Sequence, residues 1–167
     1  MAKTAKTRTI DTPLNELILR KYEKPYNLKK RDLVRKLCLS MGLLQPGDSR
    51  DVIIDVLYVF LLAKNKKEEL SSEEIRRRVE KIRKEEKLPM LGIASSNIRR
   101  QILRLRDLLI VEKVKNNYRI IEFNSLTENF ENKIEKVLLP DIMERLKMYL
   151  SELDKEFFVS EEKQKSK

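Results

Sequence analysis

The chain has 167 residues, with 37 lysines and arginines, 27 aspartates and glutamates, and no histidine. The lack of histidine excludes Ser-His catalytic triads and most zinc sites, and the single cysteine, Cys38, excludes an internal disulfide. The net charge of +10 favours an anionic polymer as partner, and nucleic acid is the most common one.

Catalysis and membrane insertion find no support in the sequence. No glycine-rich phosphate loop or nucleophile–base pair is visible, and the pairs Glu73/Glu74 and Glu85/Glu86 lie among basic residues, as on solvated ion-pair faces. We therefore expect no enzyme activity, no cofactor and no metal. No apolar run approaches the roughly 20 residues of a transmembrane helix. We expect a cytoplasmic, nucleoid-associated protein without membrane contact.

The positive charge is concentrated in the first three-quarters of the chain. Residues 1–50 hold 12 lysines and arginines against 5 aspartates and glutamates, and residues 51–123 hold 17 against 12. Residues 124–167 hold 8 against 10. Abundant lysine, glutamate and arginine with little cysteine or tryptophan is also typical of hyperthermophilic proteins. That composition would explain the density of charge, but not the surplus of positive charge.

The first quarter of the chain is predicted to hold a disordered arm followed by helices. Residues 1–11 are basic and lack periodicity, which is typical of disorder. Residues 12–49 are expected to form two helices, one over 14–22 and one over 28–41. A proline in the first turn marks the start of the former, and Gly42 marks the end of the latter. The second helix should bury Leu33, Leu37, Cys38 and Met41.

Two further helices are predicted in the middle of the chain. A helix over 50–64 carries a broad apolar face and should be central to the core. The next helix begins at Ser71, which forms a capping-box pattern with Glu74. The side chains expected to be buried from these two helices are Ile53, Val56, Leu57, Phe60, Leu61, Ile75, Val79 and Ile82.

The stretch SSNIRRQILRLR, residues 95–106, predicts an amphipathic helix with an arginine-rich face. Ser95 or Ser96 can cap its start. The spacing i, i+4, i+7, i+11 defines one buried stripe. This stripe comprises Ile98, Ile102, Leu105 and Leu109. The opposite, exposed face comprises Ser96, Arg100, Arg104 and Asp107.

The following stretch, IVEKVKNNYRIIEF, predicts a β-hairpin because it is rich in β-branched and aromatic residues on either side of two asparagines. Asparagine tolerates positive φ, which favours a tight turn. A turn at Lys115-Asn116 would place Val111 opposite Ile120 and Glu112 opposite Arg119, both favourable pairs. A turn at Asn116-Asn117 would shift the register, and both alternatives remain open.

The C-terminal region, residues 124–157, predicts a long helix that Pro140 should kink or split, followed by a disordered tail over 158–167. A helix of 20 residues spans about 30 Å, roughly the width of one small domain, so its outer end should project and need a partner. We therefore expect a homodimer, although the helix could instead fold back over a monomer. The predicted dimer interface comprises Leu138, Ile142, Leu146, Tyr149 and Leu153.

The stretch ELSSEEIRRRVEKIRKEEKLPMLGIASSNIRRQILRLRDLLIVEKVKNNYRIIEF resembles the winged helix-turn-helix superfamily, most closely the MarR-like and related archaeal transcription regulators. The resemblance implies a mainly α fold with a small β-hairpin. A winged helix-turn-helix core over 50–123 would carry extra N-terminal helices and a long C-terminal helix. The connector KLPMLGIA is longer than a compact helix-turn-helix turn, and Leu109 stands where such domains usually place a glycine. The matching residues before the wing are Leu105, Leu108, Ile110, Val111 and Glu112.

The resemblance implies binding of double-stranded DNA by a transcriptional regulator or chromatin-associated factor. The helix at 95–108 would enter the major groove, where arginine can bind guanine and asparagine can bind adenine. The wing at 110–123 would contact the DNA backbone, and a dimer would present two such helices about 34 Å apart. The implied DNA-binding residues are Ser96, Asn97, Arg99, Arg100, Arg104, Lys113, Lys115, Asn116, Asn117 and Arg119.

An alternative function belongs to a different class. Winged helices also serve as protein–protein modules without DNA contact, since a fold alone does not determine function. The partner would then belong to the transcription or chromosome machinery. Three neighbouring arginines are compatible with either function, because they could bind phosphates or the acidic surface of a partner. They are Arg76, Arg77 and Arg78.

Overall fold

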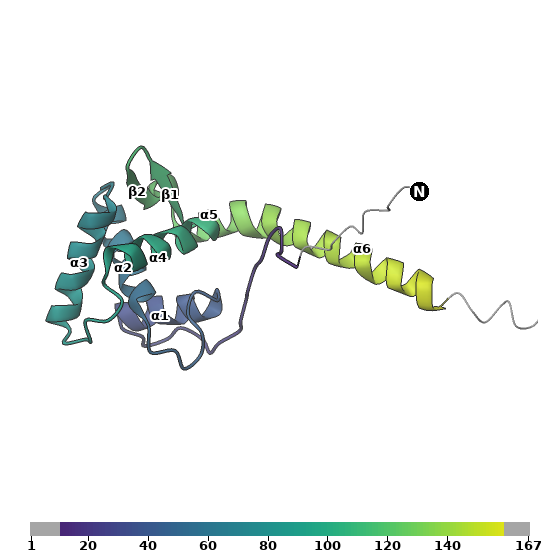
Figure 1. The fold of residues 1–167 in the computed structure, drawn as a ribbon, viewed down its shortest axis with the longest axis horizontal. Helices are drawn as coiled ribbons and strands as arrows, with labels where there is room; N and C mark the ends of the chain where they lie inside the picture. The colour runs from purple at the N-terminus through teal and green to yellow at the C-terminus, as the bar shows by residue number, and fades with distance from the viewer. Residues whose placement is uncertain (1–10, 159–167) are drawn as a thin grey trace, which may run out of the picture. The chain divides into compact units, whose positions relative to one another are not determined.

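The apolar helix α2 (Val52–Asn65) lies at the centre of the fold in the computed structural model, which describes residues 11–158. The predicted arm over 1–11 and tail over 158–167 fall almost wholly outside the described residues. Residues 17–139 form one compact unit, and residues 140–158 belong to a separate one. The chain is mainly helical with one small antiparallel sheet (Figure 1). The other elements are α1 (Lys30–Ser40), α3 (Ser72–Glu85), α4 (Ser95–Asp107), β1 (Val111–Val114), β2 (Asn117–Ile120), η1 (Ile121–Phe123), α5 (Leu126–Asn129), η2 (Phe130–Leu138) and α6 (Leu139–Phe158).

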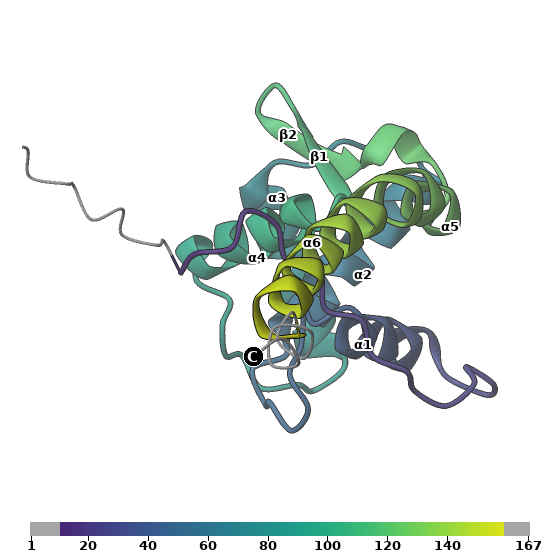
Figure 2. The ribbon, with the colours of Figure 1, turned by 90° about the vertical axis from the view of Figure 1, so that its right-hand side faces the viewer.

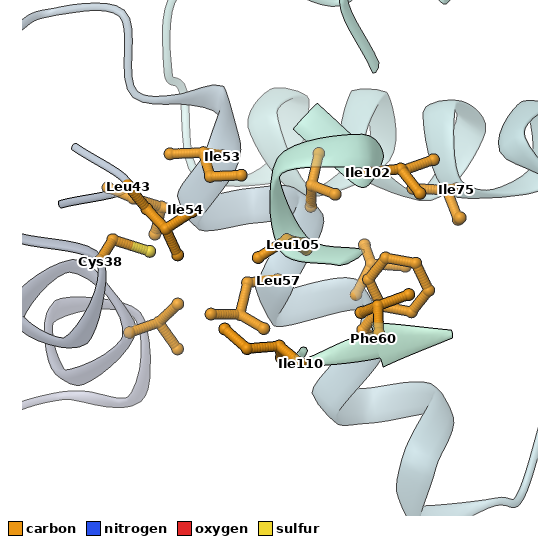
Figure 3. Close-up of a cluster of buried hydrophobic side chains, with 14 of the residues drawn as sticks. Cys38, Leu43, Ile53, Ile54, Leu57, Phe60, Ile75, Ile102, Leu105 and Ile110 are labelled. Carbon is orange, nitrogen blue, oxygen red and sulfur yellow. The ribbon is translucent and has the colours of Figure 1, made fainter. Parts of the chain in front are cut away.

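Helix α2 is buried on almost every side because it packs against α1, α3, α4 and β2. Figure 3 shows its side chains meeting those of the neighbouring helices in one apolar cluster. The prediction of a central helix is therefore confirmed, although Leu61 is only partly buried. The predicted side chains that are at most 1% exposed are Ile53, Val56, Leu57 and Phe60.

The helix predicted over 14–22 is wrong, because residues 11–29 contain no helix. Arg20 instead binds the C-terminal end of α1. Its backbone N–H donates to Ser40 O at 2.8 Å, and its guanidinium donates to Leu39 O at 2.8 Å. Carbonyls in the last turn of a helix have no partner inside the helix. These tertiary hydrogen bonds therefore hold the segment before α1 in a non-helical conformation.

Helix α1 buries a face that differs slightly from the predicted one. Val34 is buried, whereas Leu33 is 46% exposed, so the prediction for Leu33 is wrong. Cys38 is fully buried against the core. Burial raises the pKa of the Cys38 thiol to about 12, because the thiolate is not solvated there.

Gly42 follows α1, as predicted, with a φ of +70°. An added Cβ would lie 2.6 Å from Ile18 Cβ. We expect Gly42→Ala to destabilise the fold by about 1–3 kcal/mol, because it combines left-handed strain with steric overlap. Chemical denaturation can measure the loss against Gly47→Ala, since Gly47 has a φ of +79° but open space around it. Equal losses would show that the contact with Ile18 has no effect.

A buried ion-pair network joins α1, α2 and α3. Asp55 is fully buried in α2 and accepts hydrogen bonds from Arg31 Nε, at 2.8 Å, and from Arg83 Nη1. Asp51 accepts from Arg83 Nη1 at 3.1 Å and from Arg31 Nη2 at 3.2 Å. Arg83 Nε donates to Pro89 O at 2.7 Å. The same guanidinium therefore anchors α3 to α2 and holds the connector that leads to α4.

The network should make stability depend on pH. Burial by itself would raise the pKa of Asp51, but hydrogen bonds from Arg31 and Arg83 outweigh it and lower the pKa. A lowered carboxyl pKa contributes stability that is present above the unfolded-state value, about 3.9, and is lost as the pH falls through the folded-state value. We expect the urea midpoint to fall between about pH 5 and pH 3. Asp51→Asn should show a shallower fall, and parallel profiles would contradict this contribution.

Helices α3 and α4 are joined by the segment 86–94. Ser71 caps α3 as predicted, and its Oγ accepts the Glu74 N–H at 3.2 Å. The predicted cap at Ser95 or Ser96 is wrong, because α4 begins directly after Ala94. Ser95 Oγ instead donates to Glu73 Oε1 at 2.7 Å. This serine therefore links the first turns of the two helices.

Leu109 follows the cap residue of α4, Leu108, and adopts a left-handed conformation with a φ of +57°. The Ile110 N–H donates to Leu105 O at 3.0 Å, as in a Schellman motif. Glycine is the residue that adopts this conformation most easily, and a non-glycine residue costs about 1 kcal/mol. Leu109 therefore occupies the glycine-type position that the resemblance assigned to it.

The hairpin has the register of a Lys115-Asn116 turn. Val111 pairs with Ile120, and Glu112 pairs with Arg119. Lys115 has a φ of +56°, so lysine rather than asparagine adopts the left-handed conformation. Strand β2 is joined to the loop before α3, because the Leu70 N–H donates to Tyr118 O at 2.9 Å and the Tyr118 N–H donates to Leu70 O at 2.8 Å. Figure 2 shows the hairpin loop projecting away from α2, α3 and α4.

Pro140 does not end the C-terminal helix. It is the second residue of α6, and its missing N–H removes a hydrogen bond from the helical backbone, because Leu139 and the residues of η2 before it are also helical. The hydrogen-bond pattern changes just before it, from π-helical in η2 to α-helical in α6. The kink or split expected at Pro140 is therefore a change from π-helical to α-helical hydrogen bonding. No side chain of α6 is buried.

Candidate nucleic-acid interface

Helix α4 buries three residues of the predicted apolar stripe and exposes a face that includes two arginines. The fourth predicted residue, Leu109, lies beyond the helix and is only partly buried, so its place in the stripe is wrong. Ile98, Ile102 and Leu105 are at most 1% exposed and pack into the core. The exposed side chains differ from the predicted set, because Leu103 is 50% exposed whereas Arg104 is only partly exposed. The helix is therefore rotated slightly from the predicted orientation. The residues of its exposed face are Ser96, Arg99, Arg100, Leu103 and Asp107.

Hydrogen bonds fix the side chains in the first half of this face. Asn97 Nδ2 donates to Gly92 O at 2.7 Å, which ties the connector to α4. Asn97 Oδ1 accepts from Arg100 Nη2 at 2.6 Å and from Gln101 Nε2 at 3.1 Å. Arg100 is thus oriented by a neutral amide and keeps its full charge for a ligand. Asn97 is less available for reading a base than predicted, because its amide already has three partners.

Arg104 is directed toward the protein more than predicted. Its Nη2 donates to Leu43 O at 2.5 Å, and its Nη1 donates to Gln101 Oε1 at 2.8 Å. Neither partner carries a charge. Arg104 therefore links α4 to the loop after α1, and its positive charge is not neutralised by these contacts. This geometry suits a contact with a phosphate better than insertion between base edges.

The arginines of α3 are neutralised, in contrast to those of α4. Arg76 pairs with Glu73 at 3.0 Å, and Arg77 pairs with Glu74 at 3.0 Å. Arg78 is 2.7 Å from a carboxylate oxygen of Glu68. Among the described residues, the only arginine of α4 that lies within 4.0 Å of a carboxylate is Arg99, at 3.9 Å from Glu73. Of these two helices, α4 is therefore the one whose arginines are mostly unpaired.

The wing presents a second set of polar donors. Lys113, Lys115 and Asn116 are exposed, and Asn117 is partly exposed. The Lys113 ammonium lies 6.0 Å from the centre of the Tyr118 ring, a distance that allows a cation–π contact. The wing therefore exposes two lysines and one asparagine to solvent.

Arg119 was predicted to bind DNA, but its guanidinium already has partners within the fold. Its Nε donates to Glu112 at 2.7 Å, its Nη1 lies 3.0 Å from Glu69, and its guanidinium stacks on Phe123 at 4.9 Å. Burial opposes the ionisation of Glu112, but the Glu122 N–H and Arg119 outweigh it and lower the pKa of Glu112. Arg119 therefore acts as a structural clamp at the base of the wing.

One exposed basic side chain near this face, Arg50, was not predicted, whereas Arg106 was expected to meet phosphates. Arg50, in the loop before α2, is 86% exposed and lies beside Asp48, with Nε 3.4 Å from Oδ1. Arg106 lies on the other flank of α4 and is partly exposed. Periodicity could not single out Arg50, because it lies in a turn and its position depends on the tertiary fold.

Comparisons of the chain with protein-family models, with curated proteins and with solved structures found no match. Within residues 11–158, no helix combines the length and apolarity needed to cross a bilayer. The same residues contain no group of three or more acidic or cysteine side chains arranged to hold a metal ion.

Proposed function

We propose that the protein binds double-stranded DNA through the exposed face of α4 and the wing, as a transcription regulator or a chromatin-associated factor of the nucleoid. The observation that carries the proposal is the uncompensated positive charge of α4 beside the neutralised arginines of α3. Contacts with phosphates dominate the affinity of DNA-binding proteins, so guanidinium groups without carboxylate partners are the expected feature of such a surface.

The arrangement of the elements supports a winged helix-turn-helix. Helices α3 and α4 pack against each other and against α2, and the hairpin follows α4 directly. The bridge between Leu70 and Tyr118 joins the wing to the start of α3. In this arrangement Ser96, Arg99 and Arg100 enter the major groove. Lys113, Lys115 and Asn116 contact the backbone from the wing.

The proposal includes two-fold assembly through α6. Leu146, Tyr149 and Leu153 are each more than half exposed, and they share one stripe at helical spacing. Leu139, Met143, Leu150 and Phe157 widen this stripe, whereas the predicted Leu138 lies in η2, before α6. An apolar stripe along a helix of 20 residues is typical of a surface that a second helix covers.

Charge favours a second copy of α6 in antiparallel orientation. Arg145 and Glu152 are seven residues apart and border the stripe on the same side. In an antiparallel pair centred near Met148 and Tyr149, each Arg145 would face the Glu152 of the second copy. In a parallel pair in register, each Arg145 would lie at the same height as the other Arg145, and each Glu152 at the same height as the other Glu152. The two ion pairs would therefore not form.

The Arg100→Ala variant tests the DNA-binding surface. We expect it to weaken DNA binding by about 1–3 kcal/mol if the guanidinium contacts a base. Arg76→Ala is the matched control, because it removes an arginine of α3 that two glutamates already neutralise. Fluorescence anisotropy at two salt concentrations would measure both variants. Equal affinities for both variants and the intact chain would contradict this surface and favour a protein–protein module.

A further inference from the structure

A groove of about 610 Å³ is bordered by the loop that precedes α2, by the connector before α4 and by α4 itself. Its volume is within the range of small-ligand sites, about 300–1,000 Å³. Arg50 lines it from the loop, and Arg100 and Arg104 line it from α4. With Arg83 of α3, which is paired with Asp51 and Asp55, four guanidinium groups from three segments border the groove.

The walls of the groove are held in place before any ligand binds. Gln101 is 7% exposed, and it bonds to Asn97 at 3.1 Å and to Arg104 at 2.8 Å. Arg104 is fixed further by its bond to Leu43 O. A guanidinium that neutral partners orient loses little rotamer freedom when it binds an anion, so the site is preorganised.

The carboxylates of the groove do not cancel its positive charge. Asp51 is surrounded by three arginines, since Arg31 and Arg83 donate to it and Arg35 lies 3.6 Å away. Asp48 accepts the Arg50 backbone N–H at 2.9 Å. The two described carboxylates that line the groove are Asp48 and Asp51, and Asp51 is already paired. Asp48, beside the Arg50 guanidinium, is therefore the one negative charge that offsets Arg50, Arg100 and Arg104. The described lining therefore has a surplus of positive charge.

We propose that this groove binds a phosphate group between Arg50 and Arg104, with Arg100 at its rim. A phosphate of the DNA backbone and a phosphorylated small molecule offer the same chemistry. The DNA source rests on the proposed function, because the groove borders the exposed face of α4. Arg104 would then position the protein on the backbone, while Arg100 is shared between the phosphate and the major groove.

The DNA source is tested with Arg50→Gln, which changes an exposed side chain that the fold does not need. The matched control is Lys81→Gln, because Lys81 on α3 is 76% exposed and has one weak contact, with Glu85 at 3.9 Å. For a backbone contact, the slope of log K against log salt should decrease by about 0.9 in Arg50→Gln and remain unchanged in Lys81→Gln.

The small-molecule source is tested with inorganic pyrophosphate, added to the full chain at constant ionic strength. A ligand that binds only the folded state raises the melting temperature, so the intact chain and Lys81→Gln should be stabilised and Arg50→Gln should not. The pyrophosphate measurement tests the groove even if the intact chain shows no salt-dependent DNA binding. In that case the proposed DNA-binding function fails, and the phosphate site is still tested separately. Identical behaviour of Arg50→Gln and Lys81→Gln in both arms would overturn the phosphate groove.

Discussion

Asp55→Ala is expected to destabilise the fold by about 3–5 kcal/mol, the largest loss among the single substitutions considered. The variant leaves the Arg83 guanidinium, whose side chain is 3% exposed, with a reduced set of partners in the interior. It also removes the partner of Arg31 Nε. Urea denaturation of the purified variant would measure the loss in the free energy of unfolding.

Two further variants distinguish the loss of the buried ion-pair network from the general effect of removing an aspartate. Asp48→Ala removes a carboxylate whose contact with Arg50 is exposed, and should cost far less than Asp55→Ala. In Asp55→Ala/Arg83→Met, the unpaired buried charge is also removed, so the double variant should be more stable than the sum of the single losses predicts. Strict additivity would contradict a direct coupling between Asp55 and Arg83.

Leu146→Glu/Leu153→Glu is expected to convert a dimer into a folded monomer. Both positions lie on the exposed stripe of α6, so the new charges would repel each other across the pair without entering a buried core. DNA affinity should fall by about 10²–10⁴-fold, because two linked binding surfaces become one. Light scattering and fluorescence anisotropy would measure the two effects.

The control for this variant is Met148→Glu/Ser151→Glu, which adds the same charge outside the stripe and should stay dimeric. Orientation can be tested separately. Arg145→Glu should weaken an antiparallel pair, and Arg145→Glu/Glu152→Arg should restore it, since the two ion pairs are re-formed with exchanged signs. A monomeric mass for the intact chain at tens of micromolar would end the dimer proposal.

The elements with strong local signals could be predicted from the sequence. The broad apolar face of α2 and the Ser71 cap each follow from neighbouring residues, and the structure confirms them. The sequence allowed two hairpin registers, and the structure adopts the one that pairs Val111 with Ile120. The segment 14–22 could not be predicted in this way. Its helical signals are local, whereas the hydrogen bonds from Arg20 to the end of α1 join residues about 20 positions apart.

The candidate site was harder to predict, because arginines that look alike in the sequence have different partners in the fold. Arg83 belongs to the same charged helix as Arg76, yet one is buried in a network and the other lies in surface ion pairs. Arg104 and Arg119 were both predicted to contact DNA. The structure directs Arg104 to a backbone carbonyl and Arg119 to glutamates, and only tertiary packing determines these partners.

The burial of Cys38 provides a built-in reporter of core opening. The chain contains no other thiol, and this one lies between α1 and the central helix with its ionisation suppressed. Since the thiolate is the reactive form, an alkylating reagent should label the folded chain only when the core opens. The rate of labelling would then measure how often α1 separates from the core. Bound DNA should slow the labelling if the α4 surface couples to this region through Arg104 and Leu43.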